Sequence, residues 1–233
     1  MADATVLSSW LRTGADAGGV DCGDAGTSAQ RIADALRIAM REGGLVPGQR
    51  LIEAEVAEQF DVSRATVREA ILRLDEAGLV TTLRYRGAQV RRVDRACAAD
   101  LVSLLTPVQV HAAALACTSR TAGDMTRMNE LVGEVAQAAR FALWGRVAVL
   151  DRVLDRTIAR STRNTALVDT VDSLQLQLCL HRLRPSALVR IGDDMADREG
   201  VVDAIGRRDR EDAQRHEHSR RLRLEALFGR TRA

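Results

Sequence analysis

The segment from Val62 to Leu74 has the clearest pattern of apolar and polar positions in the chain. Its apolar residues follow the i, i+3, i+4, i+7 spacing that forms one stripe along a helix, namely Val67, Ala70, Ile71 and Leu74. Ser63 precedes this stripe as a candidate N-cap. The outward side carries guanidinium and hydroxyl groups suited to the DNA major groove, from Arg64, Thr66 and Arg68. An ordinary amphipathic helix with a solvated arginine face has the same pattern, so the neighbouring segments must distinguish the two.

The preceding residues predict a second helix and a tight connection. A first helix begins near Ser28, with Ile32, Leu36, Ala39 and Met40 on one face, and stops at the glycine pair 43–44. A turn over 45–49 and a short extended piece over 50–52 follow. Another helix is expected over 53–60, and residues 61–62 link it to the segment above. Two short helices joined by so brief a link form a helix-turn-helix unit.

A β-hairpin is expected directly after this unit. Residues 79–83 and 88–93 are β-capable runs around a glycine-containing turn over 84–87. The tip and the return strand carry four arginines and no acid, at positions 84, 86, 91 and 92. A helix-turn-helix followed by a basic hairpin is a winged helix, whose wing can lie on the phosphate backbone or in the minor groove.

The remainder of the chain, residues 94–233, has helical periodicity almost throughout. Six helices are predicted, over 96–119, 123–142, 145–161, 164–183, 186–206 and 209–228. Pro107 should kink or restart the first, and Pro185 should begin the fifth. Short connections between helices indicate an antiparallel bundle. The expected fold is mainly α: an acidic, flexible arm over 1–27, a winged helix-turn-helix with a small hairpin wing over 28–93, and an all-α domain over 94–233.

Composition limits the classes of function. All 34 basic residues are arginine and the net charge is only +2, so a basic surface must be local. The four cysteines are far apart and form no C-x-x-C pair, which favours reduced thiols in a cytoplasmic protein. No uninterrupted apolar run approaches the ~20 residues of a membrane span, and no secretory leader is visible. We therefore expect no membrane partner.

Residues 28–93 resemble the winged-helix domain of GntR-family transcription regulators. The matching pieces are 45–51, 55–60, 62–70, 74–79 and 86–90, in the same order as in the family. The resemblance implies that the chain binds a double-stranded DNA operator through Ser63, Arg64, Thr66 and Arg68, with Arg86 and Gly87 at the tip of the wing. Ala65 stands where many members have threonine, so one polar contact is missing.

The helical part resembles the FadR-type ligand-sensing domain, through residues 150–155 and 158–164 and through its helix layout. Many such domains bind a divalent metal through an aspartate, a histidine four residues later and two histidines on the last two helices. Here these positions hold Asp151, Asp155 and Arg198, and the fourth falls at His218 or Arg220. A protonated guanidinium cannot ligate a metal, so no metal and no other cofactor is expected.

We hypothesise that Asp151 and Asp155 face Arg198 across the bundle, with its guanidinium in the place of the metal. Together with His218 these residues mark the expected effector pocket, and an arginine in it favours an anionic small molecule.

The sequence has no motif of catalysis: no glycine-rich phosphate loop, no G-x-S-x-G and no H-E-x-x-H, so no catalytic residue is proposed. The interpretation is a cytoplasmic, homodimeric, ligand-responsive repressor. The alternative is a constitutive DNA-binding protein whose degenerate helical domain only dimerises. A metal-dependent enzyme in the bundle is a distant third.

Overall fold

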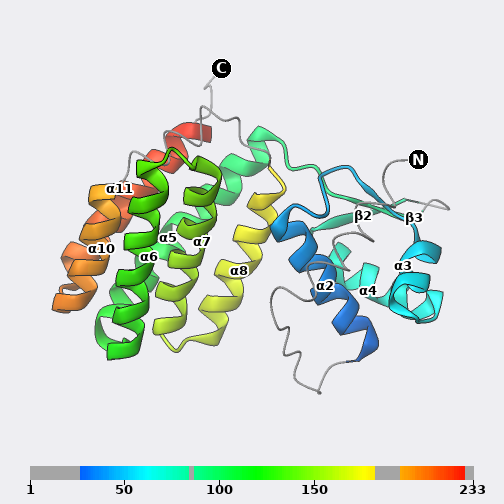
Figure 1. The fold of residues 1–233 in the computed structure, drawn as a ribbon, viewed down its shortest axis with the longest axis horizontal. Coiled ribbons are helices and arrows are strands. Elements are labelled where there is room, and N and C mark those ends of the chain that lie inside the picture. The colour runs from blue at the N-terminus through cyan, green and yellow to red at the C-terminus, as the bar shows by residue number, and fades with distance from the viewer. Residues whose placement is uncertain (1–26, 84–86, 182–194, 229–233) are drawn as a thin grey trace. The chain divides into compact units, whose positions relative to one another are not determined.

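The computed structural model describes residues 27–83, 87–181 and 195–228. Contacts divide the chain into two compact units, the first running to Val93 and including Cys179–His181, and the second holding the rest. Figure 1 gives the order of the elements, and each unit is considered by itself. The expected arm lies outside the described residues except for Thr27.

The N-terminal unit is a winged helix. Its elements are α2 (Ser28–Glu42), β1 (Arg50–Leu51), α3 (Glu53–Phe60), α4 (Arg64–Glu76), β2 (Val80–Leu83) and β3 (Gly87–Val90). The apolar stripes of α2 and α4 face each other, and their buried members include Ile32, Leu36, Val67, Ile71 and Leu74. The burial of these stripes holds α4 with its polar side outward.

The strands form one antiparallel sheet in the order β1-β3-β2. The predicted hairpin is present, with Val80 opposite Val90 and Leu83 opposite Gly87. The sequence did not reveal that β1 pairs with β3, where Leu51 lies opposite Ala88. A strand of two residues carries no periodicity, so only the tertiary pairing defines it.

The turn between α3 and α4 is set by the backbone at Asp61. This residue adopts a left-handed conformation with φ 51°, which aspartate tolerates better than most residues. The N–H of Val62 then donates to the carbonyl of Ala57 at 3.0 Å, which closes the C-terminus of α3. The chain is thereby redirected within two residues, as a helix-turn-helix requires.

The C-terminal unit is an all-α domain. Its described helices are α5 (Arg95–Ser119), α6 (Ala122–Arg140), α7 (Trp144–Ser161), α8 (Thr165–Cys179), α10 (Met195–Arg207) and α11 (Arg210–Phe228). They correspond closely to the six predicted segments, although the first part of the fifth, with Pro185, lies outside the described residues. The mainly α fold class is therefore confirmed.

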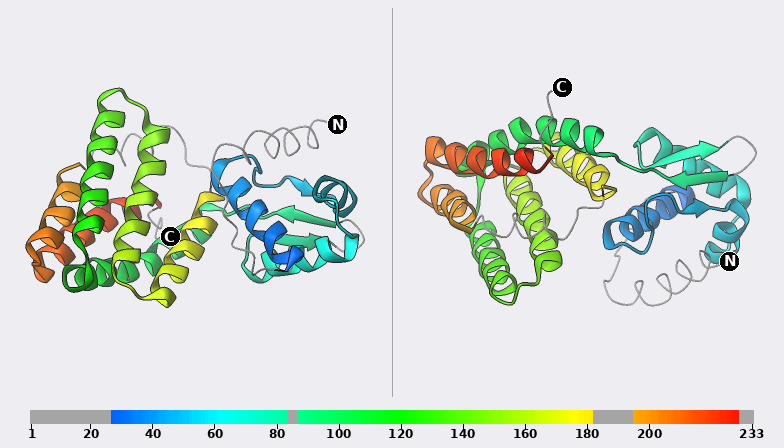
Figure 2. Two further views of the ribbon diagram at one scale, coloured as in Figure 1. Left: turned by 60° about the horizontal axis from the view of Figure 1, so that its bottom comes forward. Right: turned by 90° about the horizontal axis from the view of Figure 1, so that it is seen from above.

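Helix α5 is the longest helix of this domain and packs against α11, α7 and α10. The pairs α6–α7 and α10–α11 form antiparallel hairpins around a common apolar core (Figure 2). The helix continues through Pro107 rather than restarting there, contrary to one of the two outcomes expected. By length and composition alone α5 could cross a membrane, although its sequence contains no uninterrupted apolar run of that length. Because 50% of that apolar window is buried in the described structure, α5 has the character of a core helix.

Candidate functional site

The first turn of α4 is closed by a pair of hydroxyl groups. Ser63 is the N-cap, and its Oγ accepts from the backbone N–H of Thr66 at 3.1 Å. The same oxygen lies 2.8 Å from Oγ1 of Thr66. Both hydroxyls are therefore engaged in capping the helix. Arg64 and Arg68 project from the same turns and are exposed.

An open groove of about 880 Å³ lies between α4 and the sheet. Of the described residues that line it, three are arginines and one is an acid, namely Arg50, Arg64, Arg68 and Glu53. Gly87 and Thr82 line its sheet side. The groove thus joins the outward face of α4 to the base of the wing within the N-terminal unit, and its charge is predominantly positive.

Glu53 and Arg68 form an ion pair in this groove. Nε of Arg68 donates to Oε1 of Glu53 at 3.1 Å, and Nη2 donates to Oε2 at 2.7 Å. The hydrogen bond from Arg68 lowers the pKa of Glu53, and the bond to Glu53 raises the pKa of Arg68. Both groups are therefore charged, and the carboxylate fixes one edge of the guanidinium.

Gly87 begins β3 with φ +78°, a conformation that side chains rarely adopt. A Cβ at this position would lie 2.8 Å from the carbonyl oxygen of Leu51 on the neighbouring strand. The glycine is thus required by strand packing, apart from any contact with DNA. Arg86, the other residue expected at the wing tip, lies outside the described residues.

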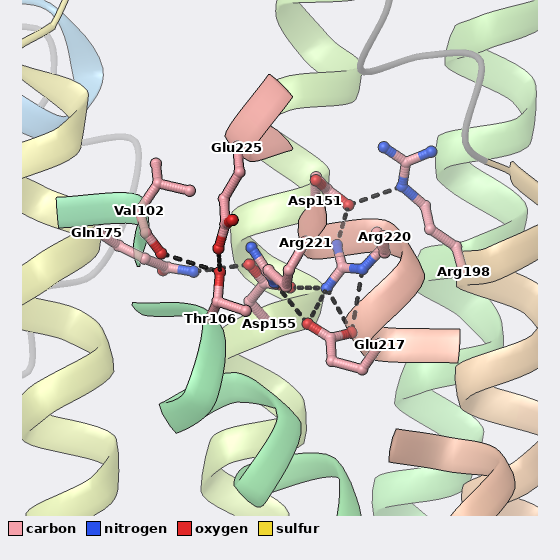
Figure 3. A network of polar contacts seen from close by, with 10 residues as sticks. All are labelled: Val102, Thr106, Asp151, Asp155, Gln175, Arg198, Glu217, Arg220, Arg221 and Glu225. Carbon is pink, nitrogen blue, oxygen red and sulfur yellow. Dashed lines mark hydrogen bonds and ion pairs between the residues drawn. The ribbon is translucent and has the colours of Figure 1, made fainter. Parts of the chain in front are cut away.

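The C-terminal unit contains a buried cluster of charges contributed by three helices. We call it the charge cluster; it comprises three carboxylates and three guanidiniums, from Asp151, Asp155, Glu217, Arg198, Arg220 and Arg221. Figure 3 shows these side chains converging from α7, α10 and α11. Equal numbers of both signs make the cluster neutral as a whole, which burial requires.

Asp151 connects two of the guanidiniums. Its Oδ1 accepts from Nε of Arg198 at 2.7 Å and from Nη1 of Arg220 at 2.8 Å. Arg198 is only 1% exposed, whereas the side chain of Asp151 is 16% exposed and is the cluster's most accessible member. The expected pairing of Arg198 with Asp151 is therefore present.

Asp155 has different partners from those predicted. It accepts from Nη2 of Arg220, lies 2.5 Å from Nη2 of Arg221, and accepts from the amide of Gln175 at 2.9 Å. Of the two aspartates of α7, Asp151 is the one to which Arg198 donates, whereas Asp155 lies one helical turn further along and contacts Arg220 and Arg221 of α11. In place of the predicted triad around Arg198, the two aspartates share three arginines, and Arg220 contacts both of them.

His218 does not take part in the charge cluster. It is exposed on α11, whereas Arg220, two residues later, is buried with 4% of its side chain accessible. Residues two apart on a helix point in different directions, so only one of these two candidates could face inward. Of the two candidates, Arg220 is the one that faces the charge cluster, and the placement of His218 beside Asp151 and Asp155 is corrected.

The neighbouring charges favour the ionised forms of Asp151 and Arg220 despite the burial of both groups. Burial alone would raise the pKa of Asp151, but attraction from Arg220 and Arg198 outweighs it and holds the pKa well below its usual range. Burial likewise opposes the charge of Arg220, and Asp155, Glu217 and Asp151 more than compensate, so its pKa is raised. The charged form of each partner thus depends on the others.

These residues do not fit a metal. The oxygen of Asp151 that would bind a cation already accepts two guanidinium N–H groups, and guanidiniums offer no lone pair. In the described part of the chain no group of three or more histidine, cysteine, aspartate or glutamate side chains is arranged to hold an ion.

Sequence reasoning overlooked Glu217 and Arg221 and left Arg220 as an alternative. A signal was present: Glu217 stands three and four residues before Arg220 and Arg221, the spacing that brings side chains together on one helix face. Nε of Arg221 donates to Oε1 of Glu217 at 2.6 Å, and Nε of Arg220 donates to Oε2 at 3.1 Å. Because α11 is a highly polar helix, the same spacing is equally typical of a solvent-exposed face. The sequence alone therefore does not show that Glu217, Arg220 and Arg221 are buried.

Comparison with known proteins identifies the two halves. Residues 28–90 match the bacterial regulatory proteins of the gntR family, and residues 100–221, more than half of the chain, match the FCD domain. The chain belongs to the gntR family. This gntR-family protein is a DNA-binding transcription regulator and not an enzyme.

Curated relatives of this gntR-family regulator carry the same description. The Nta operon transcriptional regulator of Aminobacter aminovorans is 29% identical over 128 residues, which cover 55% of this chain and 60% of that protein. The HTH-type transcriptional regulator McbR of Escherichia coli is 24% identical over 64% of this chain and 67% of that protein. The repressor RspR of E. coli is 42% identical over a shorter stretch, 22% of this chain and 23% of its own.

Solved structures show the same fold. E. coli McbR/YncC superposes with a TM-score of 0.73 at 20% identity, covering 87% of this chain and 97% of that one. A GntR transcriptional regulator of Rhodococcus sp. RHA1 gives a TM-score of 0.68 at 22% identity, covering 86% of this chain and 96% of that one.

Proposed function

We propose that this regulator acts in the cytoplasm as a homodimeric repressor that binds a pseudo-palindromic operator and releases it when a small-molecule effector binds the helical domain. The observation that carries the proposal is the outward face of α4, where Arg64 and Arg68 stand exposed beside a predominantly basic groove. A capped helix that presents two arginines from its first turns suits the major groove of DNA. Repression is the role that the name of one relative states.

Base recognition is assigned to the arginines rather than to the hydroxyls. Ser63 and Thr66 already bond each other and the helix N-terminus, so they can contact phosphate only by sharing these bonds. Arg64 has no such engagement with a described residue. We therefore propose Arg64 and Arg68 as the main major-groove contacts, and Gly87 as the residue that lets the wing approach the DNA closely.

The test begins with selection of the genomic DNA fragments that the purified protein binds, followed by footprinting. Arg64→Ala should lose about 1–3 kcal/mol of discrimination, the contribution of one bidentate arginine–guanine contact, while the fold is retained. Arg31→Ala is the matched control, because Arg31 is exposed on α2 and does not line the groove. Equal footprints for Arg64→Ala and the parent protein would refute the assignment.

The effector part of the proposal rests on the charge cluster. Asp151 is its accessible member and holds the guanidinium of Arg198, so an anionic ligand arriving there would compete with Asp151 for Arg198. Carboxylic acids screened for release of the selected DNA fragment test this directly. If the protein stays bound under every condition, the helical domain serves only dimerisation, and the protein is a constitutive DNA-binding regulator.

A further inference from the structure

The ion pair between Glu53 and Arg68 joins the two helices of the helix-turn-helix. Glu53 is in the first turn of α3, and Arg68 is in the second turn of α4. Glu53 is also the one acid among the described residues that line the basic groove. An acid in a surface that attracts phosphates weakens that attraction, so its presence calls for a specific role.

The geometry of the pair leaves one edge of the guanidinium available. Glu53 binds the side edge, through Nε at 3.1 Å and Nη2 at 2.7 Å. Nη1 donates to no described residue, and one hydrogen of Nη2 also points away from the carboxylate. These two nitrogens form the end-on edge, which can donate in bidentate fashion to N7 and O6 of guanine.

Stability does not account for the pair. The side chain of Arg68 is 63% exposed and that of Glu53 is 23% exposed. Exposed ion pairs contribute little to the free energy of unfolding, because solvent screens them and ordering two long side chains costs entropy. What the pair does supply is a fixed orientation of an otherwise mobile guanidinium.

We propose that Glu53 is a positioning residue for DNA recognition: it holds Arg68 by one edge so that the other edge meets a guanine in the operator. The proposal rests on the DNA-binding function proposed above. Glu53 itself touches no base. It raises selectivity between sequences and at the same time lowers the affinity for DNA in general, because its charge opposes the phosphates.

The experiment compares the full-length protein and its variants on two probes, the DNA fragment recovered by selection and a scrambled duplex of the same composition. Glu53→Gln should reduce the ratio of the two affinities roughly tenfold, a value within the range of one bidentate arginine–guanine contact. Binding to the scrambled duplex should become tighter and more dependent on salt, because one negative charge is lost. Glu55→Gln is the matched control: Glu55 is exposed in the same helical turn, and the same charge change there should leave the ratio intact.

Two further variants separate positioning from charge and from folding. Glu53→Asp keeps the charge but is too short to bind both nitrogens, so it should lower the ratio without making the salt dependence steeper. In an Arg68→Ala background, Glu53→Gln should no longer change the ratio, since its effect passes through Arg68. The melting temperature, followed by circular dichroism, should be nearly unchanged in Glu53→Gln, in Glu53→Asp and in the Arg68→Ala background.

The outcomes decide between explanations. A ratio that falls equally with and without Arg68, or that is unchanged in Glu53→Gln, overturns the positioning role while operator binding by the parent protein stands. A parent protein that binds both probes equally overturns the proposed operator recognition, and the role of Glu53 with it.

Discussion

Replacing Arg220 with methionine should destabilise the helical domain severely. Arg220 is 4% exposed and contacts all three carboxylates of the charge cluster: Asp151 at 2.8 Å, Glu217 at 3.1 Å, and Asp155. Methionine fills much of the same volume but leaves three buried carboxylates with two guanidiniums. Leaving a buried charge without its partner typically lowers the free energy of unfolding by ~3–5 kcal/mol.

That loss is large compared with the stability of a domain, which is usually about 5–15 kcal/mol. For a domain of this size it corresponds to a fall in melting temperature of roughly 10–20 °C. Differential scanning calorimetry of the full chain can measure it, since the two units can unfold in separate transitions. Urea titrations at 25 °C supply the free energy independently.

Arg207→Met is the matched control. Arg207 also contacts carboxylates, those of Asp203 at 2.8 Å and Asp212 at 2.6 Å, but its side chain is 52% exposed. When the arginine is removed, Asp203 is solvated because it is 67% exposed, and Asp212 keeps its contact with Arg215 at 2.7 Å, so the melting temperature should hardly change. Glu217→Gln combined with Arg220→Met restores charge balance and should recover part of the loss. Equal melting temperatures for Arg220→Met and Arg207→Met would refute the reasoning.

Three further predictions follow from the same structure. First, the pKa of Asp151 is lower in the folded than in the unfolded state, so its stabilising effect is complete above about pH 4 and is lost as the pH falls towards the folded value. In calorimetry from pH 7 to pH 3, the melting temperature of the parent protein should therefore fall more steeply than that of Asp151→Asn. Second, EDTA should leave the melting temperature unchanged and elemental analysis should find no stoichiometric metal, because guanidiniums occupy Asp151; a bound ion would contradict the structure of the charge cluster. Third, light scattering at micromolar concentration should find a dimer, since the helical domain exposes large apolar side chains such as Leu104 and Val149, at 55% and 49%; a monomer on a single half-site would contradict it.

Local signals allowed much of the winged helix to be predicted from the sequence. The cap at Ser63, the apolar stripe of α4 and the glycine stop of α2 each depend on residues close together in the chain, and each is present in the structure. The pairing of β1 with β3 depends instead on residues far apart. The residues around Leu51 give no indication that it pairs with Ala88, so this pairing is known only from the folded structure.

The charge cluster shows the same division between local and distant information. Resemblance to a family located Asp151, Asp155 and Arg198, but the register of α11 decided whether His218 or Arg220 faced inward. That register is set by packing along α5 and α10, which a single sequence does not record. Polar residues obey no burial pattern as simple as that of apolar ones, because a buried charge is tolerated only where distant partners meet it.

The pairing of β1 with β3 also bears on how the DNA-binding unit folds. Hydrogen bonds between Arg50–Leu51 and Ala88–Gln89 close a loop that contains the whole of α3 and α4. Closing such a loop costs conformational entropy before the strands gain anything, and the cost is repaid only when helices and sheet assemble together. Helices α3 and α4 and the β2–β3 hairpin should therefore fold and unfold in one cooperative transition. Hydrogen exchange should show similar opening free energies in α4 and β3, and the surface offered to an operator would then be either complete or absent.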